Sequence, residues 1–548
     1  MLPSLGRAGL ERAEIYFLDG ARGMVETGDL LVPHYRAKPF FDKPPLTYWL
    51  MAASFQVFGP VPAAARLVAA LAAIAAVAAV VGLGRALGLG LKASLTGGLV
   101  LATTHAFVSF GRIAMSDMLL TLFSTTAVAL AMWPVTEHRR LLRAAALGVV
   151  LGLGFLTKGP VAVLFPCLGI AALGWMRGVR RLDVAPTAVT AVAFLVVGVP
   201  WFALIYARLG SGPLAYFFLR ENLERFAGPT YDAQRPFWYY LPTYLAIGMP
   251  WSLFLPAAAA RAGRVRERDA LRGLLLWAAL MLVPLSLSRG KIDYYLLPLL
   301  PALSLVVGVF LTDDAWSRGE TRYVRVTTIV LGVLLLALAL APWIFPEAWR
   351  PARWLAVAVS IGMAATALAM VASARAPALR APTPAIAAGS AAVHLAAVIV
   401  LVPAFVGGQP NAHVLADVSR ELRYRPDAGF AFCSDPTRVA RDVLFYERVS
   451  WLESCDELWA AAGGKLPFLL LVSEAERRSL GQIEFVREIG DYVYLPPTAL
   501  SASALWQHPR PARLYLIANF ETDEPVAMER WRKERKRDLQ RLEEEGAR

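Results

Sequence analysis

The sequence has little charge and very little cysteine for its length. Of its 548 residues only 18% are Asp, Glu, Lys or Arg, while 57% are hydrophobic. A soluble domain of this size needs more charge on its surface, so water is not the main solvent of this chain. The three cysteines, Cys167, Cys433 and Cys455, do not have the spacing of a zinc site.

The sequence also lacks a glycine-rich phosphate-binding loop, so nothing points to a bound nucleotide. The net charge of +13 would suit a nucleic-acid-binding protein, but the arginines fall in short loops between apolar windows. That distribution is the signal that orients membrane spans. We therefore expect a lipid bilayer, and no nucleic acid, among the partners of the chain.

The hydrophobic residues are concentrated in windows of about 20 residues, the length of helix that crosses a hydrocarbon core of roughly 30 Å. The windows lack the strict alternation of barrel strands, so they predict helices. They predict a mainly α-helical, polytopic bundle of about twelve spans. The windows lie near 61–83, 94–111, 118–134, 144–157, 160–176, 185–206, 239–260, 270–287, 294–311, 326–345, 354–373 and 385–405.

Basic residues recur in every second connection between these windows. By the positive-inside rule those connections are cytoplasmic. The remaining connections, which include residues 1–60, 207–238 and 288–293, then face outward, and an even number of spans places both termini outside. The basic connections contain Arg85 and Lys92; Arg139, Arg140 and Arg143; Arg177, Arg180 and Arg181; Arg261, Arg264, Arg266, Arg268 and Arg272; Arg318, Arg322 and Arg325; and Arg375 and Arg380.

Composition predicts four regions: a first extracytoplasmic loop at 1–60, a transmembrane domain at 61–405, a small extracytoplasmic α/β domain at 406–523, and a charged helical tail at 524–548.

Within the third region, β-like runs at 429–433 and 468–472 alternate with a helical stretch at 456–462. Topology places Cys433 and Cys455 in an oxidising compartment, where they form either a disulfide or two buried free thiols.

Charged residues that are unusual near a membrane all map to the outer loops or outer helix ends of this topology. Such groups are costly at membrane depth and tend to face cavities, although single ones also serve as interfacial anchors. A phosphate-linked donor needs cations for its oxygens and a carboxylate to accept a proton. The same groups would suit a transporter of an anionic substrate. They are Glu14, Asp19, Asp42, Lys43, Asp117, Lys158, Glu221, Arg225 and Lys291, joined by Tyr295.

Six strings decide between these interpretations. They are 28–34 with 39–50 (GDLLVPH and PFFDKPPLTYWL), 116–120 (SDMLL), 154–161 (GFLTKGPV), 221–226 (ENLERF), 236–242 (PFWYYLP) and 288–298 (SRGKIDYYLLP). In this order they resemble the bacterial GT-C glycosyltransferases, whose members include the aminoarabinose lipid A transferases and the dolichyl-phosphate-mannose protein mannosyltransferases. The resemblance covers about residues 14 to 302.

The resemblance implies a GT-C type fold in the inner membrane. It also implies an enzyme that transfers one sugar, with inversion, from a polyprenyl-phosphate donor to an extracytoplasmic acceptor such as lipid A, a glycan or a protein. Glu221 and Lys158 would organise the acceptor or the first loop.

The resemblance also implies how the donor is held. Lys43 and Arg225 would bind the carrier phosphate. Lys291 and Tyr295 would line the donor cavity beside it.

The sequence departs from the family at two positions. The first outer loop of the family usually begins with an Asp-Glu pair in which the Asp is the favoured catalytic acid or base, and here Ala13 and Glu14 stand in its place. Either Glu14, Asp42 or Asp117 takes the catalytic role, or the chain is inactive. Asn222 stands where the lipid A transferases have a His associated with a metal, so we assign no metal cofactor.

The main alternative is a transporter or flippase of lipid-linked anions. It would predict inverted repeats and broken helices near mid-membrane, and no convincing repeat is found. A structural scaffold, a third alternative, would not need the six motifs.

The amino-terminal end also raises an expectation. Residues 1–13 contain Arg7, Glu11 and Arg12 and are too short to span or to act as a signal peptide. The family opens with a spanning helix before this loop, so we expect that the chain as written lacks its first transmembrane helix. The alternative is that the first span inserts with its amino end outside.

Overall fold

A computed structural model describes Leu5 and residues 12–35, 38–179, 183–224, 226, 235–344, 353–375, 383–396, 411–425, 427–432, 451–453, 467–473, 476–478, 487–494 and 512–518. The chain divides into two compact units, Met1–Ala404 and Phe405–Arg548. Arg225, Cys433, Cys455, the stretch 456–462 and the tail 524–548 lie outside the described residues. The predictions made for them remain predictions.

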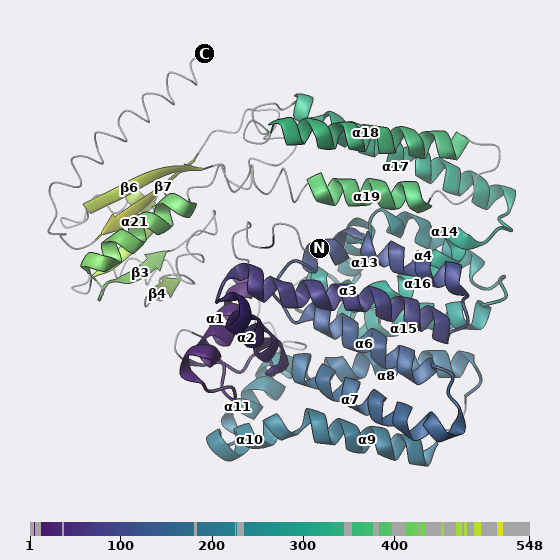
Figure 1. The fold of residues 1–548 in the computed structure, drawn as a ribbon, viewed down its shortest axis with the longest axis horizontal. Helices are drawn as coiled ribbons and strands as arrows, with labels where there is room; N and C mark the ends of the chain where they lie inside the picture. The colour runs from purple at the N-terminus through teal and green to yellow at the C-terminus, as the bar shows by residue number, and fades with distance from the viewer. Residues whose placement is uncertain are drawn as a thin grey trace. The chain divides into compact units, whose positions relative to one another are not determined.

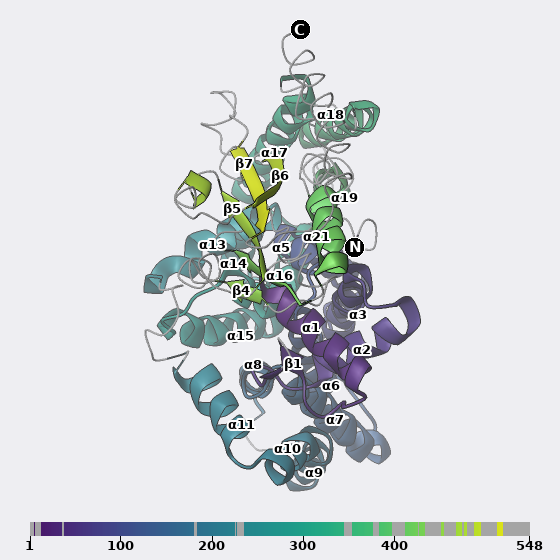
Figure 2. The same ribbon diagram turned by 90° about the vertical axis from the view of Figure 1, so that its left-hand side faces the viewer.

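The first unit is helical, apart from a two-stranded hairpin of β1 (His34–Tyr35) and β2 (Lys38–Pro39). Its longer helices run side by side, and α1, α2 and α11 lie at the end that faces the viewer in Figure 2 (Figures 1 and 2). The α-helices are α1 (Arg12–Thr27), α2 (Leu46–Phe58), α3 (Pro62–Ala86), α4 (Leu91–Ala102), α5 (His105–Phe110), α6 (Asp117–Met132), α7 (Arg140–Lys158), α8 (Val161–Met176), α9 (Val184–Gly198), α10 (Pro200–Leu209), α11 (Gly212–Ala215), α13 (Tyr240–Ile247), α14 (Leu255–Arg261), α15 (Arg268–Leu287), α16 (Leu300–Thr312), α17 (Arg318–Ile344), α18 (Arg353–Arg375) and α19 (Thr383–Ala396).

Tighter and wider helical turns link these helices. They are the 3₁₀ segments η1 (Glu137–Arg139), η3 (Phe237–Tyr239), η4 (Trp251–Phe254) and η5 (Asp293–Leu299), and the π-helical segment η2 (Tyr216–Glu224).

Among the described residues six helices are long and apolar enough to cross a membrane, or eight if each of two bent pairs is one span. The chain is therefore a multi-pass membrane protein, as predicted. The count of twelve stays a prediction, because several predicted windows form shorter helices. The 12 residues of α4, for instance, extend about 18 Å at 1.5 Å per residue, which is less than the hydrocarbon thickness. The predicted span at 239–260 is one of the bent pairs, with an angle of 109° between its halves.

The centre of the first unit is α16, whose residues Leu300–Leu311 are all buried. This helix packs against α4 and α15. A Cβ atom on Gly308 would lie only 2.6 Å from the backbone nitrogen of Gly97, so the two helix backbones approach too closely for any larger residue. Small residues at such contacts are what allow close packing where water supplies no hydrophobic driving force.

The predicted basic loops gather at one end of the bundle. A polar cavity of 580 Å³ is lined by residues 89–93, 261, 264–267, 309 and 312–315, which belong to three of these loops and the helix ends beside them. Arg177 of a fourth loop donates a hydrogen bond of 2.9 Å to the carbonyl of Leu87. The structure thus brings together loops that the positive-inside rule assigns to one compartment.

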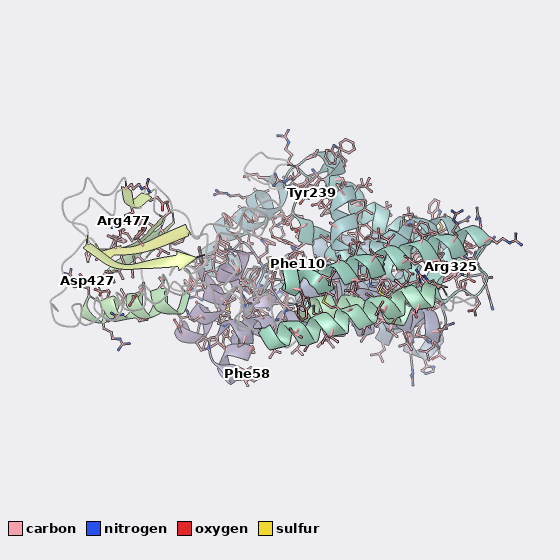
Figure 3. All side chains as sticks on the ribbon, turned by 90° about the horizontal axis from the view of Figure 1, so that it is seen from above. Phe58, Phe110, Tyr239, Arg325, Asp427 and Arg477 are labelled. Carbon is pink, nitrogen blue, oxygen red and sulfur yellow. The ribbon has the colours of Figure 1, made fainter. Side chains whose placement is uncertain are left out.

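The first loop lies at the other end. Figure 3 shows Arg325, in the first turns of α17, towards one end of the bundle and Phe58, the last residue of α2, towards the opposite end. The end of α2 in the predicted outer region and the start of α17 beside a predicted basic loop therefore lie at opposite ends of the bundle.

The second unit contains a five-stranded mixed sheet in the order β4-β3-β5-β7-β6 and the helix α21 (Asn411–Tyr424). Strands β3, β4 and β5 are parallel, whereas β7 is antiparallel to both of its neighbours. The predicted β-like runs correspond to β3 and β5. The strands are β3 (Gly429–Phe432), β4 (Trp451–Glu453), β5 (Phe468–Ser473), β6 (Arg487–Tyr494) and β7 (Ala512–Ala518).

Candidate active site

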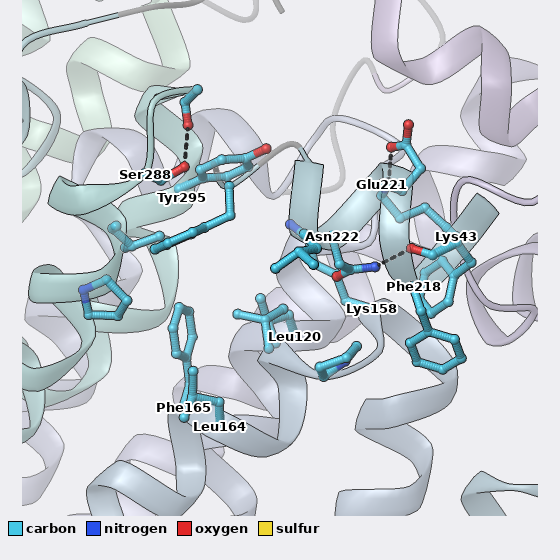
Figure 4. Close-up of a pocket in the computed structure, with 18 of the residues that line it drawn as sticks. Lys43, Leu120, Lys158, Leu164, Phe165, Phe218, Glu221, Asn222, Ser288 and Tyr295 are labelled. Atoms are coloured by element: carbon cyan, nitrogen blue, oxygen red, sulfur yellow. Dashed lines mark hydrogen bonds and ion pairs between the residues drawn. The ribbon is translucent and has the colours of Figure 1, made fainter. Parts of the chain in front are cut away.

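A cavity of 730 Å³ opens beside the first loop of the membrane unit. Its charged side chains lie together on one side, and Leu164 and Phe165 of α8 lie away from them, so the cavity has a polar end and an apolar end (Figure 4). Six residues predicted as site residues line it. They are Asp42, Lys43, Asp117, Lys158, Glu221 and Tyr295.

Lys158 and Asp117 form one ion pair of the polar end. Lys158 is the last residue of α7 and Asp117 is the first of α6. The ammonium donates a hydrogen bond of 2.5 Å to the carboxylate, and it lies 5.1 Å from the ring centroid of Tyr295. Asp117 is buried, so its charge is compensated chiefly by this lysine.

Lys43 and Asp42 form the second charged group, which the first loop supplies. The ammonium of Lys43 lies 3.7 Å from a carboxylate oxygen of buried Glu221 and donates to the backbone carbonyl of Asp42 at 2.8 Å. The phenol of Tyr216 donates to the Asp42 carboxylate at 2.8 Å. Glu221 reaches the cavity from the π-helical turns of η2, a conformation that is frequent at functional sites.

Most of the rest of the wall is apolar, apart from Asn222, Ser288 and Tyr295. Phe217 and Phe218 of η2, Leu120 of α6 and Pro284 of α15 contribute to it. A long hydrocarbon chain fits such a wall because it exchanges one apolar environment for another, while its polar end reaches the charged side chains. These residues were not singled out from the sequence, since inside an apolar window they look like ordinary membrane-spanning residues.

A smaller cavity of 120 Å³ adjoins the polar end, because Asp42, Lys43, Asp117 and Lys158 line both cavities. Ala13 lies in its wall. The position where the family carries its favoured catalytic Asp therefore faces this small cavity, but here it holds a methyl group.

Tyr48 is a further wall residue of the small cavity that sequence analysis missed. It is 0% exposed, and among the described residues no group forms a hydrogen bond with its hydroxyl. Its ring is held in place, since a Cβ atom on Gly20 would lie 2.6 Å from it and Phe17 packs against it at 5.4 Å between centroids. A buried hydroxyl without a partner is costly, so it is suited to meet a polar ligand.

Glu14, a predicted catalytic residue, lies elsewhere. It is 0% exposed and forms a two-pronged ion pair with Arg66 of α3, at 2.8 and 2.7 Å. It also accepts a hydrogen bond of 2.8 Å from the backbone of Ala114. Glu14 therefore ties α1 to α3 and to the segment before Asp117, and it is not among the described residues that line either cavity.

The first loop is fastened at a second place, outside the cavity. Asp29 forms an ion pair of 2.8 Å with Arg208 of α10, and the indole of Trp201 donates to the carbonyl of Leu31 at 2.9 Å. Burial raises the pKa of Asp29, but the hydrogen bonds from the Leu31 amide and from Arg208 outweigh it, so the pKa is lowered. The loop is thus fixed at a second place ahead of Asp42 in the chain.

Two predicted donor-binding residues are not placed at the cavity wall. Lys291 is buried, donates to the carbonyl of Ser288, and is not among the described lining residues, although Ser288 and Gly290 are. Burial lowers the pKa of its ammonium group. Arg225 lies outside the described residues, but its neighbour Phe226 lines the cavity.

The position Asn222, where the family carries a metal-associated His, lies in the cavity wall and donates to the carbonyl of Phe217 at 2.7 Å. Within the described part of the chain no group of three His, Cys, Asp or Glu side chains is arranged to hold a metal ion.

The chain is similar to known proteins over much of this unit. Residues 42–203 match the family model described as dolichyl-phosphate-mannose-protein mannosyltransferase. The undecaprenyl phosphate-alpha-4-amino-4-deoxy-L-arabinose arabinosyl transferase of Pseudomonas aeruginosa is 32% identical over 325 residues, 58% of each chain. The corresponding transferase 1 of Sodalis glossinidius is 27% identical over 355 residues, 63% of each chain. The matched part thus spans about three fifths of the length of these curated relatives.

Solved structures extend the similarity to the fold. The crystal structure of ArnT from Cupriavidus metallidurans bound to undecaprenyl phosphate has 21% identity and a TM-score of 0.70, covering 95% of this chain and 96% of that one. The apo structure of the same protein gives a TM-score of 0.72. The predicted resemblance and the predicted class of helical membrane fold are both confirmed.

Proposed function

Because the chain resembles the GT-C glycosyltransferases of the aminoarabinose lipid A transferase type in sequence and in fold, we propose that it is a glycosyltransferase. It transfers a sugar, with the 4-aminopentose of its relatives as the first candidate, from undecaprenyl phosphate to an extracytoplasmic acceptor such as lipid A. The observation that carries this proposal is one cavity with an apolar wall and a polar end that combines lysines with carboxylates. A polyprenyl phosphate has the same two parts.

In this proposal the carrier chain lies along the apolar wall and its phosphate meets Lys43 and Lys158. With Asp42, Asp117 and Glu221 beside them, these two lysines leave the described polar end with one net negative charge. A phosphate therefore needs a further cation, and Arg225, next in sequence to Glu224 and Phe226, is our candidate. Lys291 supports the loop that carries Ser288 instead of touching the donor.

The proposed reaction is a direct displacement. The acceptor hydroxyl oxygen forms a bond to the anomeric carbon, the bond from that carbon to the phosphate oxygen breaks, and the phosphate leaves with the electron pair. Asp42 takes the proton of the hydroxyl. Asp42 and Asp117 both line the two cavities, but Asp42 is only half-buried, whereas Asp117 is buried and paired with Lys158. Glu14 is paired with Arg66 and lines neither cavity. We therefore choose Asp42.

We also propose that this end of the bundle faces the extracytoplasmic side. The support is the separation of the first loop from the basic loops, which the positive-inside rule assigns to the cytoplasm. In a chain whose three native cysteines are replaced by serine, a cysteine introduced at exposed Lys38 should react with a membrane-impermeant maleimide on intact spheroplasts, while one at exposed Arg264 should not. Labelling of Arg264→Cys alone would contradict this orientation.

Transfer itself is tested with purified protein in detergent. Radiolabelled polyprenyl-phosphate sugars and a lipid A acceptor are incubated with it, and the products are separated by thin-layer chromatography. We expect label to move to the acceptor. Uptake of the intact lipid-linked sugar into vesicles without transfer would instead support the transporter.

Replacing Lys43 by Ala should weaken donor binding. A charge-assisted hydrogen bond contributes about 1.5 to 3 kcal/mol, which corresponds to roughly a tenfold to a hundredfold loss of affinity. Binding of polyprenyl phosphate to the variant in detergent, followed by microscale thermophoresis, gives the change. Lys38→Ala, which removes an exposed lysine of the same loop, is the matched control and should bind like the native protein. Unchanged affinity in Lys43→Ala would remove this lysine from the phosphate site.

Replacing Tyr48 by Phe should separate stability from transfer. If the hydroxyl has a polar partner only when the sugar is bound, its removal relieves an unpaired buried group in the free protein, so thermal stability should rise or stay unchanged. The transfer rate should fall about twofold to tenfold, because a neutral hydrogen bond contributes about 0.5 to 1.5 kcal/mol. Loss of stability together with unchanged transfer would show that the hydroxyl has a structural partner instead.

A further inference from the structure

A second large cavity, of 510 Å³, lies in the membrane unit and shares no lining residue with the candidate active site. Its wall is formed by α5, the turn before η4, and helices α17, α18 and α19. The α17 residues in the wall, Leu331 to Leu338, fall within the candidate span Arg318–Leu340. The wall is apolar except for His105, Ser390 and His394. The cavity is therefore at the depth of lipid chains.

A hydrogen bond links His105 and His394, and its donor and acceptor can be assigned. Nδ1 of His394 lies 2.7 Å from the carbonyl oxygen of Ser390, and because a carbonyl only accepts, this nitrogen carries the proton. In the neutral ring its Nε2 is then an acceptor, so Nδ1 of His105, at 3.2 Å, donates to it. The second nitrogen of His105 is left with a lone pair. The pair consequently offers a hydrogen-bond acceptor at the cavity.

This polar corner is held in position by neighbouring elements. The hydroxyl of Ser390 donates to the backbone carbonyl of Thr103 at 2.5 Å. The indole of Trp251 donates to the Thr103 hydroxyl at 3.0 Å. These bonds tie Ser390, whose carbonyl accepts from His394, to Thr103 and Trp251 in two other parts of the chain.

We propose that this cavity binds one hydrocarbon chain of a membrane lipid whose head group donates a hydrogen bond to His105, as the ammonium of phosphatidylethanolamine can. The chain fills an apolar cavity that opens among membrane helices. The acceptor nitrogen selects a head group with an N–H donor. Phosphatidylcholine carries the same charges but has no N–H donor. Its acyl chain can therefore fill the cavity, but its head group cannot donate a hydrogen bond to His105.

The bound lipid would also support the candidate active site. His105 begins α5 and Phe110 ends it. The ring of Phe110 packs against Tyr294 at 5.6 Å between centroids, and Tyr294 lines the small cavity. A lipid bound at His105 therefore contacts the first residue of α5. The last residue of the same helix, Phe110, packs against Tyr294 in the wall of the small cavity.

The test is lipid retention, measured by native mass spectrometry on the full chain after delipidation and incubation with phosphatidylethanolamine or phosphatidylcholine of identical acyl chains. We expect at least fivefold more retained phosphatidylethanolamine. Leu338→Trp, which fills the cavity from a half-exposed position, should reduce its retention at least fivefold. Leu340→Trp, equally exposed on α17 but outside the wall, should not.

The head-group contact has its own pair of variants. His105→Phe should lower phosphatidylethanolamine retention to the level of phosphatidylcholine, whereas His138→Phe, on an exposed loop, should leave it unchanged. Equal retention of the two lipids by the native chain would overturn the head-group selection. Retention unaffected by Leu338→Trp would overturn the site. Neither readout depends on sugar transfer, so the inference and the proposed function fail separately.

Discussion

Replacing Asp42 by Asn is expected to slow sugar transfer by about a hundredfold to ten-thousandfold, the range that a positioned general base contributes. The amide keeps the shape of the carboxylate and can still accept the hydrogen bond of Tyr216, but it cannot take up the proton of the acceptor hydroxyl. The measurement is the transfer rate at saturating donor and acceptor. Donor affinity should change only a few-fold, because Lys43 still holds the phosphate.

Asp29→Asn is the matched control, since Asp29 belongs to the same loop but pairs with Arg208 outside the cavity. It should keep nearly full activity. An Asp42→Asn variant that retains more than a tenth of the native rate would move the base elsewhere. Asp117→Asn would then be the next variant to examine.

Replacing Arg66 by Met is expected to cost about 3 to 5 kcal/mol of the free energy of unfolding, because it leaves the Glu14 carboxylate buried without its cation. The change is measured by denaturation in mixed micelles. The double variant Glu14→Gln, Arg66→Met removes both charges and should recover a large part of the loss.

Arg140→Met is the comparison, since Arg140 forms ion pairs with Glu137 and Asp183, whose side chains are 85% and 49% exposed. Exposed pairs contribute about 0 to 1 kcal/mol, so this variant should remain close to native stability. If both single variants lose the same small amount, the pair of Glu14 and Arg66 is not the tie between α1 and α3 that the structure indicates.

The helical membrane fold was predictable because apolarity is a local property of the sequence. A window such as 61–83 becomes α3 since any long apolar stretch in lipid must satisfy its own backbone hydrogen bonds. Helix ends were not predictable in the same way. The apolar window at 94–111 is divided between α4 and α5 around Thr103 and Thr104, and the hydroxyls of these residues donate to carbonyls of the preceding turn. Hydropathy does not register such polar breaks.

The candidate site was predictable where charge is rare. Asp42, Lys43, Asp117 and Lys158 stood out because ionisable residues near apolar windows are costly, and the structure brings them to one cavity. Glu14 stood out for the same reason. Its role as one half of a buried pair was hidden, because its partner lies 52 residues away.

Tyr48 and the aromatic residues of η2 gave no such signal. A tyrosine in an apolar stretch has the composition of an interfacial anchor, and only the fold shows that its hydroxyl is buried beside a cavity. The role of Arg225 remains a prediction of the resemblance, whereas for Lys291 we propose support of the loop that carries Ser288.

The contact between Gly97 and Gly308 has a consequence for how the unit is assembled. A helix that is apolar on all sides partitions into the bilayer whatever its neighbours. The leucines and valines of α16 therefore explain why it inserts, but they do not determine which helix it packs against. The position of α16 beside α4 depends instead on Gly97 and Gly308, because only residues without a side chain allow the two helix backbones to approach so closely. During biogenesis α4 therefore enters the membrane before its partner α16 has been made, and it must remain accessible in the lipid until the chain has grown by about two hundred residues.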